Sequence, residues 1–334
     1  MEDNKDNQPQ EESAKPLDAP HNPEPEKNEA EKKSSEEKAV KLIDLLKAIF
    51  SGYGEGGTDK AQTFAKRVIN QYLQQEAKKF ACLNNYNLLI LFDKGSLVKS
   101  DADNIYNAIT SFKDNKPILL ILFSGGGSAG SAYLIGKLCR EYSEGNFSVS
   151  IPRYAKSAAT LLCCAANEIH MGSLSELGPI DPQIDDLPAL GLKNSIEHLA
   201  ELAKKYPESS NMFAKYLHLS LNLVNIGYYE RVAESAMQYS ERLLETHEAV
   251  LPKKPKEIAF DLVYKYKDHG FVIDKEEAEQ IFGDKIIKSN SEEYDLGNAI
   301  YKALEMIQGF FGNLGYNFYH IGSLYTQSDI TKRR

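Results

Sequence analysis

Ser157 is the first residue whose type and setting could do chemistry. It stands directly before a run of small and apolar residues, Ala158 to Leu162, that predicts a helix. A serine at such a place is commonly a helix cap, because its hydroxyl can accept a backbone N–H of the first turn. The same place also favours a nucleophile, since the positive end of the helix dipole and the Ala158 N–H face whatever the hydroxyl attacks. The residues alone leave both interpretations open.

A run of three glycines, Gly125, Gly126 and Gly127, is the second candidate. It follows an apolar stretch at residues 117–123 that predicts a buried strand, and a helical pattern comes next. Backbone N–H groups in such a turn can hold a phosphate or a developing oxyanion. No Gly-Lys-Ser/Thr follows, which argues against a P-loop, and a purely structural turn is the other interpretation.

Asp181 is the third candidate, because Pro179 and Pro182 bracket it in a rigid turn. A carboxylate fixed in this way suits an orienting or substrate-contacting role. Aspartate is also an ordinary residue of proline-containing turns.

Alternating strands and helices must position these segments. The apolar runs lie at residues 88–92, 117–123 and 147–151, and the helical patterns between them lie at 101–112 and 129–142. Continuous apolar strands of this kind are buried on both faces, which predicts a mainly parallel sheet in an α/β domain. Functional loops lie at the carboxyl ends of such strands, where Gly126 and Ser157 both stand.

The other segments differ in composition. Residues 1–38 hold twelve acidic and six basic residues and almost no apolar ones, which predicts a disordered acidic tail. Residues 39–84 indicate a helical extension, packed on the main body or on a neighbouring subunit. The main domain is expected at 85–312, mostly helical after Pro188. Residues 313–334 are aromatic and then basic, and we expect a C-terminal tail that docks or frays.

Several motifs in a fixed order resemble the serine dehydrogenase proteinase family, which belongs with the ClpP-class serine peptidases and is related to signal peptide peptidase. The motifs are SGGG at 124–127, YAKSAATL at 154–161, AANEIHM at 165–171, LGPIDPQ at 177–183 and HGFVIDKEEA at 269–278. The resemblance implies a ClpP/crotonase-like fold of stacked ββα units. It also implies assembly into a homo-oligomer (a trimer, hexamer or ring) and hydrolysis of peptide bonds in a peptide or unfolded protein.

The resemblance assigns roles to individual positions. Ser157 falls on the nucleophile, Gly126 and Gly127 on the oxyanion turn, and Ala158 supplies the N–H that follows the nucleophile. Gly125 departs from the family, which commonly has proline there. Glycine keeps the turn but gives it more conformational freedom.

The base that would accept the Ser157 proton is less clearly marked. ClpP-type enzymes place a histidine downstream of the serine, where this chain has residues 179–182 and no histidine. His269 is the candidate, because it precedes the segment in which these enzymes carry the triad acid. Asp181 or Asp268 would orient it, and the sequence does not choose between them.

A Ser-Lys pair is the competing mechanism, since a desolvated lysine can also activate a serine. Lys193, Lys204 and Lys205 occupy the stretch in which relatives similar to signal peptide peptidase supply such a lysine.

Composition excludes other classes. Lys plus Arg total 39 and Asp plus Glu 48, so the net charge of −9 argues against nucleic acid or anionic lipid as a partner. No apolar run is long enough for a membrane span, and the acidic start has no secretory signal, so we expect a cytoplasmic protein. The four cysteines lack zinc-site spacing, and neither a pyridoxal phosphate lysine site nor a basic coenzyme A cluster is recognised.

The sequence therefore predicts a cytoplasmic serine endopeptidase that uses no cofactor or metal. The alternative is a catalytically inactive oligomeric scaffold, or a peptide-binding protein, with the same fold.

Overall fold

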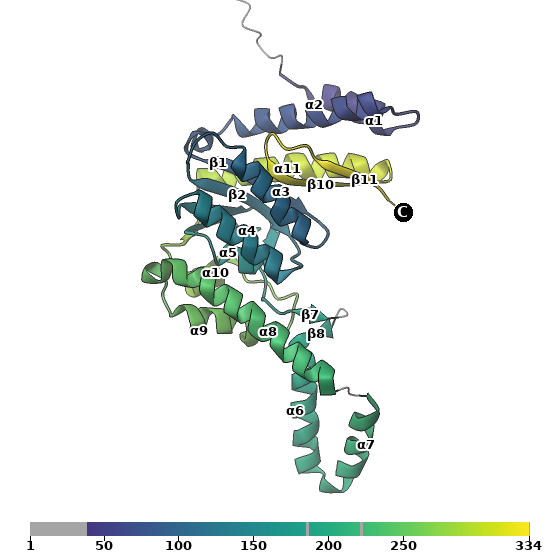
Figure 1. Cartoon of the computed structure of the whole chain (residues 1–334), viewed down its shortest axis with the longest axis vertical. Coiled ribbons are helices and arrows are strands. Elements are labelled where there is room, and N and C mark those ends of the chain that lie inside the picture. The colour runs from purple at the N-terminus through teal and green to yellow at the C-terminus, as the bar shows by residue number, and fades with distance from the viewer. Residues whose placement is uncertain (1–38, 185–186, 221–222, 334) are drawn as a thin grey trace, which may run out of the picture. The chain divides into compact units, whose positions relative to one another are not determined.

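A mainly parallel β-sheet forms the centre of the structure, a computed structural model that describes residues 39–184, 187–220 and 223–333 (Figure 1). The strand order is β11-β10-β1-β2-β3-β5-β9, with β4 pairing to β2 and to β6. In this sheet the neighbours β1, β2, β3, β5 and β9 pair in parallel, whereas β10 runs antiparallel to β1 and to β11. The strands are β1 (Asn87–Asp93), β2 (Ile118–Ser124), β3 (Phe147–Ile151), β4 (Tyr154–Ala155), β5 (Glu168–Met171), β6 (Glu176–Leu177), β9 (Ile287–Lys288), β10 (Tyr316–Ser323) and β11 (Asp329–Lys332). The predicted α/β class is confirmed.

One face of the sheet is covered by helices that follow the central strands. The core on this side includes the side chains of Leu89 and Leu91 from β1, together with those of Leu120 and Leu122 from β2. The helices that pack there are α3 (Lys99–Thr110), α4 (Ala129–Tyr142), α5 (Ala158–Cys163), α8 (Leu223–Leu244), α9 (Pro255–Phe260) and α10 (Lys275–Phe282).

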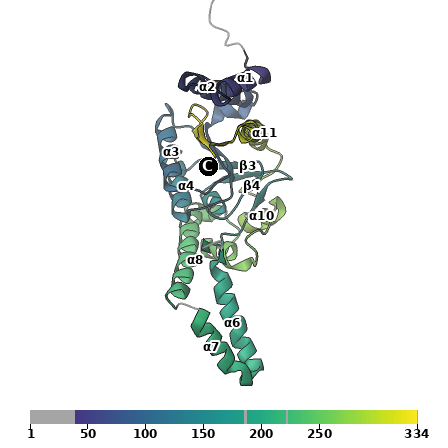
Figure 2. The same cartoon turned by 90° about the vertical axis from the view of Figure 1, so that its right-hand side faces the viewer.

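The opposite face carries a second core formed by the alternate residues of the same strands. Leu88, Ile90 and Phe92 of β1 point to this side. The covering helices are α1 (Leu42–Tyr53), α2 (Asp59–Ala77) and α11 (Glu292–Asn313), so the helical segment before the sheet shares a core with it (Figure 2). Because both faces are covered, the central strands β1 and β2 have long continuous apolar runs, as the sequence predicted.

The segment after the Asp181 turn is mainly helical. A short hairpin of β7 (Gln183–Ile184) and β8 (Leu187–Pro188) leads into α6 (Ala189–Lys205). Helix α6 packs along α8 and contacts α7 (Ser210–Ser220). Short helical turns connect the rest: η2 (Ala81–Asn85), η3 (Pro207–Ser209), η4 (Glu245–Val250) and η5 (Asp261–Lys265).

The end of the chain differs from the expected tail at 313–334. Strand β10 pairs with β1 in the register Leu89 to Ser323, and β11 pairs with β10. Phe318 of β10 is completely buried and stacks on Phe311 of α11 at 5.4 Å. The segment is ordered here because it covers the edge of β1, whose N–H and C=O groups would otherwise be unpaired.

Candidate active site

Ser157 lies in the sharp turn between β4 and α5. Its backbone has φ +53° and ψ −118°, which is unusual for a residue other than glycine. Its hydroxyl makes no capping hydrogen bond to α5, and the first turn of the helix is closed by backbone bonds instead. The structure thus places the serine at the helix N-terminus without using its side chain as a cap.

The glycine turn after β2 lies directly against this serine. Gly126 has φ +105° and Gly127 has φ +138°, and both therefore need to be glycine. A Cβ atom added to Gly126 would lie 2.7 Å from the Lys156 carbonyl oxygen and 2.8 Å from the Ser157 Cβ. Gly125, where the family pattern differs, has open space around it.

A short backbone bridge holds the glycine turn in place. The Leu97 N–H donates to the Gly126 carbonyl oxygen at 2.8 Å, and the Ser128 N–H donates to the Leu97 carbonyl oxygen at 2.9 Å. Leu97, in the loop after β1, therefore pairs with the turn on both sides of Gly127.

Two backbone N–H groups of the glycine turn and the serine turn are unused within the described residues. The Gly126 N–H donates to the Ser124 hydroxyl at 3.1 Å, so it is already bonded. The N–H groups of Gly127 and Ala158 make no hydrogen bond to any residue that the structure describes. Free N–H donors, one in the glycine turn and one at the start of α5, can stabilise developing negative charge on an oxygen atom.

His269 and Asp181 come from distant segments and lie close together. The His269 Nδ1 is 3.8 Å from the Asp181 Oδ2, and the Gln183 side-chain amide donates to the same oxygen at 2.9 Å. Asp181 is 6% exposed, and its Oδ1 and the His269 Nδ1 are buried without a hydrogen bond among the described residues. Such a pair can tighten into a hydrogen bond when a substrate binds.

Strand pairing brings the serine and the histidine segments to the same edge of the sheet. Ala155 pairs with Leu177, and Leu177 exchanges two backbone hydrogen bonds with Ile273 at 2.8 and 3.1 Å. Ser157 follows the first of these residues and His269 precedes the last. No hydrogen bond joins their side chains within the described part of the chain.

The other candidates for orienting or activating groups are placed differently. Asp268 accepts a hydrogen bond from the Gly270 N–H at 3.0 Å, which is a local turn contact. Lys204 and Lys205 are exposed near the end of α6, and the Lys205 ammonium lies 5.4 Å from the centre of the Tyr206 ring. The side chain of Lys193 lies outside the described residues.

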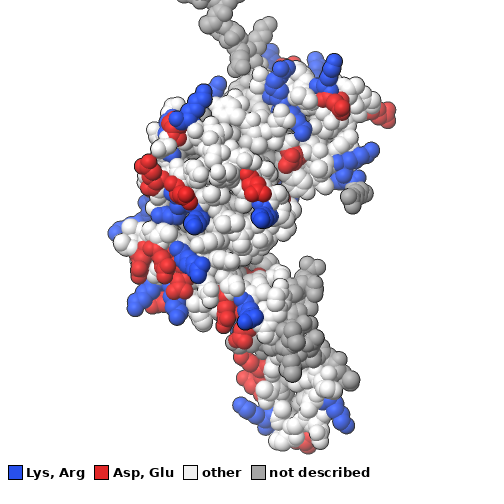
Figure 3. All heavy atoms as spheres, viewed as in Figure 1, with Lys and Arg blue, Asp and Glu red and all other residues white. Residues whose placement is uncertain are grey.

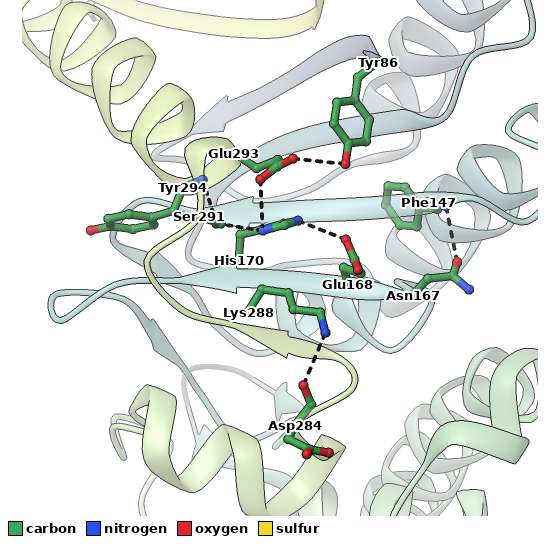
Figure 4. Close-up of polar contacts among 10 residues, drawn as sticks. All are labelled: Tyr86, Phe147, Asn167, Glu168, His170, Asp284, Lys288, Ser291, Glu293 and Tyr294. Carbon is green, nitrogen blue, oxygen red and sulfur yellow. Dashed lines mark hydrogen bonds and ion pairs between the residues drawn. The ribbon is translucent and has the colours of Figure 1, made fainter. Parts of the chain in front are cut away.

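His170 belongs to a separate buried cluster that joins β5 to the start of α11 (Figure 4). Its Nδ1 is 2.8 Å from the Ser291 hydroxyl and 3.8 Å from a Glu293 carboxylate oxygen. Its Nε2 is 3.6 Å from a Glu168 oxygen. Burial lowers the pKa of His170 to about 4, which keeps the ring neutral, and the contacts indicate a structural role.

The sequence interpretation missed two residues at this site. The Ser124 hydroxyl accepts a hydrogen bond from the Gly126 N–H, and the Lys156 side chain extends from the Ser157 turn to neighbouring segments. Both adjoin motifs that were recognised, but nothing in their residue types shows which groups they contact.

No metal or membrane feature is found in the described part of the chain. No group of three or more His, Cys, Asp or Glu side chains could hold a metal ion there, and all four cysteines are buried and unpaired. Within the same residues, every helix is too short or too polar to cross a bilayer. On the face shown in Figure 3, basic and acidic side chains are interspersed.

The fold and the geometry define an α/β protein with a candidate serine-hydrolase site. Residues 62–211 match the sequence model of the ClpP-like SDH-type serine proteinases, so the family predicted from the sequence is confirmed over this part of the chain.

Two uncharacterized proteins of Methanocaldococcus jannaschii are also similar. One is 30% identical over 178 residues, which cover 48% of this chain and 59% of the relative. The other is 32% identical over 126 residues, which cover 38% of this chain and 40% of the relative. The chain thus spans between two fifths and three fifths of the length of these relatives.

Two solved structures are similar at low identity. A serine-to-alanine mutant of the 1510-N membrane-bound stomatin-specific protease is 14% identical, covers 67% of this chain and 86% of that one, and has a TM-score of 0.39. A lysine-to-alanine mutant of the same protease in complex with a substrate peptide is 13% identical, covers 74% and 88%, and has a TM-score of 0.38. The family match supports the peptidase class for this chain.

Proposed function

We propose that this protein is a serine endopeptidase that cleaves peptide bonds through an acyl-enzyme on Ser157. The family match supports hydrolysis of this class. The observation that carries the proposal is the meeting of Ser157, held at φ +53°, with the glycine turn and two free N–H groups. A serine needed only as a cap would use its hydroxyl, and this one does not.

In the proposed reaction, the Ser157 Oγ gives its proton to the His269 Nε2 and attacks the scissile carbonyl carbon. The N–H groups of Gly127 and Ala158 stabilise the resulting oxyanion, while Gly126 forms the wall behind the serine. The histidine then protonates the leaving amine as the C–N bond breaks. Water hydrolyses the ester and returns the proton to Ser157.

Asp181 orients the histidine in this proposal. The His269 Nδ1 faces its carboxylate, which leaves Nε2 free for the serine. Burial of the carboxylate and its bond from Gln183 fix the direction from which it acts. A buried carboxylate at this place stabilises the imidazolium that forms during catalysis.

The expected biological setting follows the family resemblance. The substrate is a peptide or an unfolded protein, the protein works as a homo-oligomer, and it acts in the cytoplasm. The steps of the proposed reaction need no metal or cofactor.

A catalytically inactive scaffold or peptide-binding protein is the second candidate. It is favoured by the missing hydrogen bond from Ser157 to His269 and by the 3.8 Å separation between the histidine and Asp181. In such a protein the same site would bind peptides without cleaving them.

A cleavage assay distinguishes the two candidates. Unfolded casein is incubated with the wild type, with Ser157→Ala and with Ser235→Ala, which alters an exposed serine of α8. We expect fragments by mass spectrometry from the wild type and Ser235→Ala only. Casein bound by the wild type without any fragments would support the scaffold.

A further inference from the structure

Lys156, the residue before Ser157, has its ammonium group enclosed by oxygen atoms. The Nζ is 3.1 Å from a Glu176 carboxylate oxygen and donates to the carbonyl oxygens of Leu177 at 3.2 Å and Phe271 at 3.3 Å. The side chain is 16% exposed. An ammonium group has three N–H donors, so these three partners match its full capacity.

The partners belong to segments that carry the proposed catalytic groups. Phe271 lies two residues after His269, in the same loop. Leu177 belongs to β6, the strand that exchanges hydrogen bonds with Ile273. The lysine therefore connects the serine turn directly to the histidine loop, beside the indirect connection through β6.

The backbone of Lys156 is fixed in the serine turn. Its N–H donates to the Ser124 carbonyl oxygen at 3.0 Å, and its carbonyl oxygen accepts the Ala159 N–H at 2.8 Å. Its aliphatic stem passes over Gly178, where an added Cβ would lie 2.5 Å from the lysine Cδ. One residue thus has its main chain in one catalytic segment and its charged end in another.

The presence of a charged ammonium group at this largely buried position needs a physical explanation. Removing an ammonium group from water costs free energy that its oxygen partners offset only in good geometry. An apolar side chain of the same length would fill the space without that cost. The cation contributes something else, namely directional bonds to the carbonyl oxygens of Leu177 and Phe271.

We propose that Lys156 is a positioning residue that holds the His269 loop against the Ser157 turn. The inference rests on the proposed function, because it gives the lysine a role in aligning base and nucleophile. The lysine does not act as the base, since its three donors are all engaged. Alignment of this kind matters because small displacements of a catalytic group reduce rates steeply.

Hydrogen exchange tests the positioning without reference to activity. Lys156→Met keeps the stem and removes the ammonium, and Lys265→Met is the control, because Lys265 makes an exposed ion pair with Glu277. We expect amides of residues 267–273 to exchange about tenfold faster in Lys156→Met and unchanged in the control. Unchanged exchange in Lys156→Met would overturn the proposal.

Glu176→Gln provides a second variant in case Lys156→Met does not fold. It leaves the lysine in place but removes the carboxylate that anchors the ammonium. The same peptide should exchange faster by a smaller factor. Wild-type exchange in a folded Glu176→Gln protein would count against the proposal.

Labelling of Ser157 by a fluorophosphonate tests whether Lys156 affects the serine through His269. We expect Lys156→Met to lower the labelling rate by about 10- to 100-fold, and to lower it no further when His269 is already alanine. Equal factors in both backgrounds would mean that the lysine acts on the serine turn alone, which overturns the proposal. A wild type that is not labelled would contradict the proposed function, while hydrogen exchange would still decide on Lys156.

Discussion

Ser157 has a backbone conformation that serine rarely adopts. A positive φ at a residue with a Cβ costs about 1–3 kcal/mol and persists where the surrounding structure holds it. Here the hydrogen bond from the Lys156 N–H to the Ser124 carbonyl and the start of α5 hold it from both sides. Strain of this kind clusters at functional sites, because it presents a side chain where a relaxed turn would not.

Gly126 provides a residue-scale prediction. Gly126→Ala should lower the rate of Ser157 labelling by a fluorophosphonate about 100-fold, because the new Cβ would meet the Lys156 carbonyl and displace the serine. Gly125→Ala is the matched control, since a Cβ there meets nothing within 4 Å, and its rate should stay within about twofold of the wild type. Equal rates in the two variants would show that the turn does not support the serine.

The sequence indicated some of the candidate residues more clearly than others. Ser157 and the glycine turn were found because residue type and position beside a strand already limit what they can do. The proximity of His269 and Asp181 depends on tertiary packing of two segments far apart in the chain, so the sequence left Asp181 and Asp268 as equal alternatives. The contacts of Lys156 depend on the same packing and had no signal of their own.

At the scale of elements, β10 completes the sheet next to β1. Phe318 lies in the centre of an aromatic group, with Phe311 stacked at 5.4 Å and Phe92 at 6.3 Å. This group joins α11, β10 and β1. Strand β10 therefore contributes to the second core through Phe318.

Phe318→Ala should cost about 3–5 kcal/mol of unfolding free energy, because it leaves a cavity in a fully buried site. Tyr325→Ala, in the loop after β10, changes a side chain that is 73% exposed and should alter stability by about 0.5 kcal/mol or less. Urea denaturation followed by circular dichroism measures both. Equal midpoints would contradict the packing described for β10.

The central elements could be predicted because each has a clear period or a continuous apolar run. The strands at 88–92, 117–123 and 147–151 appear almost unchanged as β1, β2 and β3. Strand β10 was not predicted, because its glycine and polar residues interrupt the alternation and its order comes from pairing with a strand at the other end of the sequence. Distant pairing of this type leaves little local pattern.

At the scale of the whole molecule, three buried histidines make the stability of the fold depend on pH. Burial lowers the pKa values of His170, His247 and His320 to about 4, against an ordinary value of 6.5. His320 is completely buried, with its ring nitrogens 2.8 Å from the Ser328 hydroxyl and 3.0 Å from the Ser323 carbonyl. The folded state therefore keeps these rings neutral.

Stability should fall as pH decreases from about 6.5 to about 4. Over that range the unfolded chain binds protons on these histidines and the folded chain does not, so each histidine weakens the fold by up to about 1.4 kcal/mol per pH unit. Above pH 6.5 the rings are neutral in both the folded and the unfolded chain, so this loss of stability is absent. Denaturant titrations at several pH values measure the slope.

Histidine variants show how much of the dependence of unfolding free energy on pH comes from the buried histidines and how much from other groups. His170→Gln should reduce the acid dependence by about one proton, whereas His198→Gln, at an exposed position of α6, should leave it unchanged. Identical slopes in the wild type and His170→Gln would contradict a neutral, buried His170.

Labelling by a fluorophosphonate probe, read by intact mass, tests the central claim most directly, namely that Ser157 is an activated nucleophile. The account predicts one probe adduct on the wild type, none on Ser157→Ala, and a rate at least about 100-fold lower on His269→Ala. Loss of labelling in Ser157→Ala alone, with a wild-type rate in His269→Ala, would direct attention to a lysine base. A folded wild-type protein that acquires no adduct at neutral or alkaline pH would contradict the claim and favour the peptide-binding scaffold.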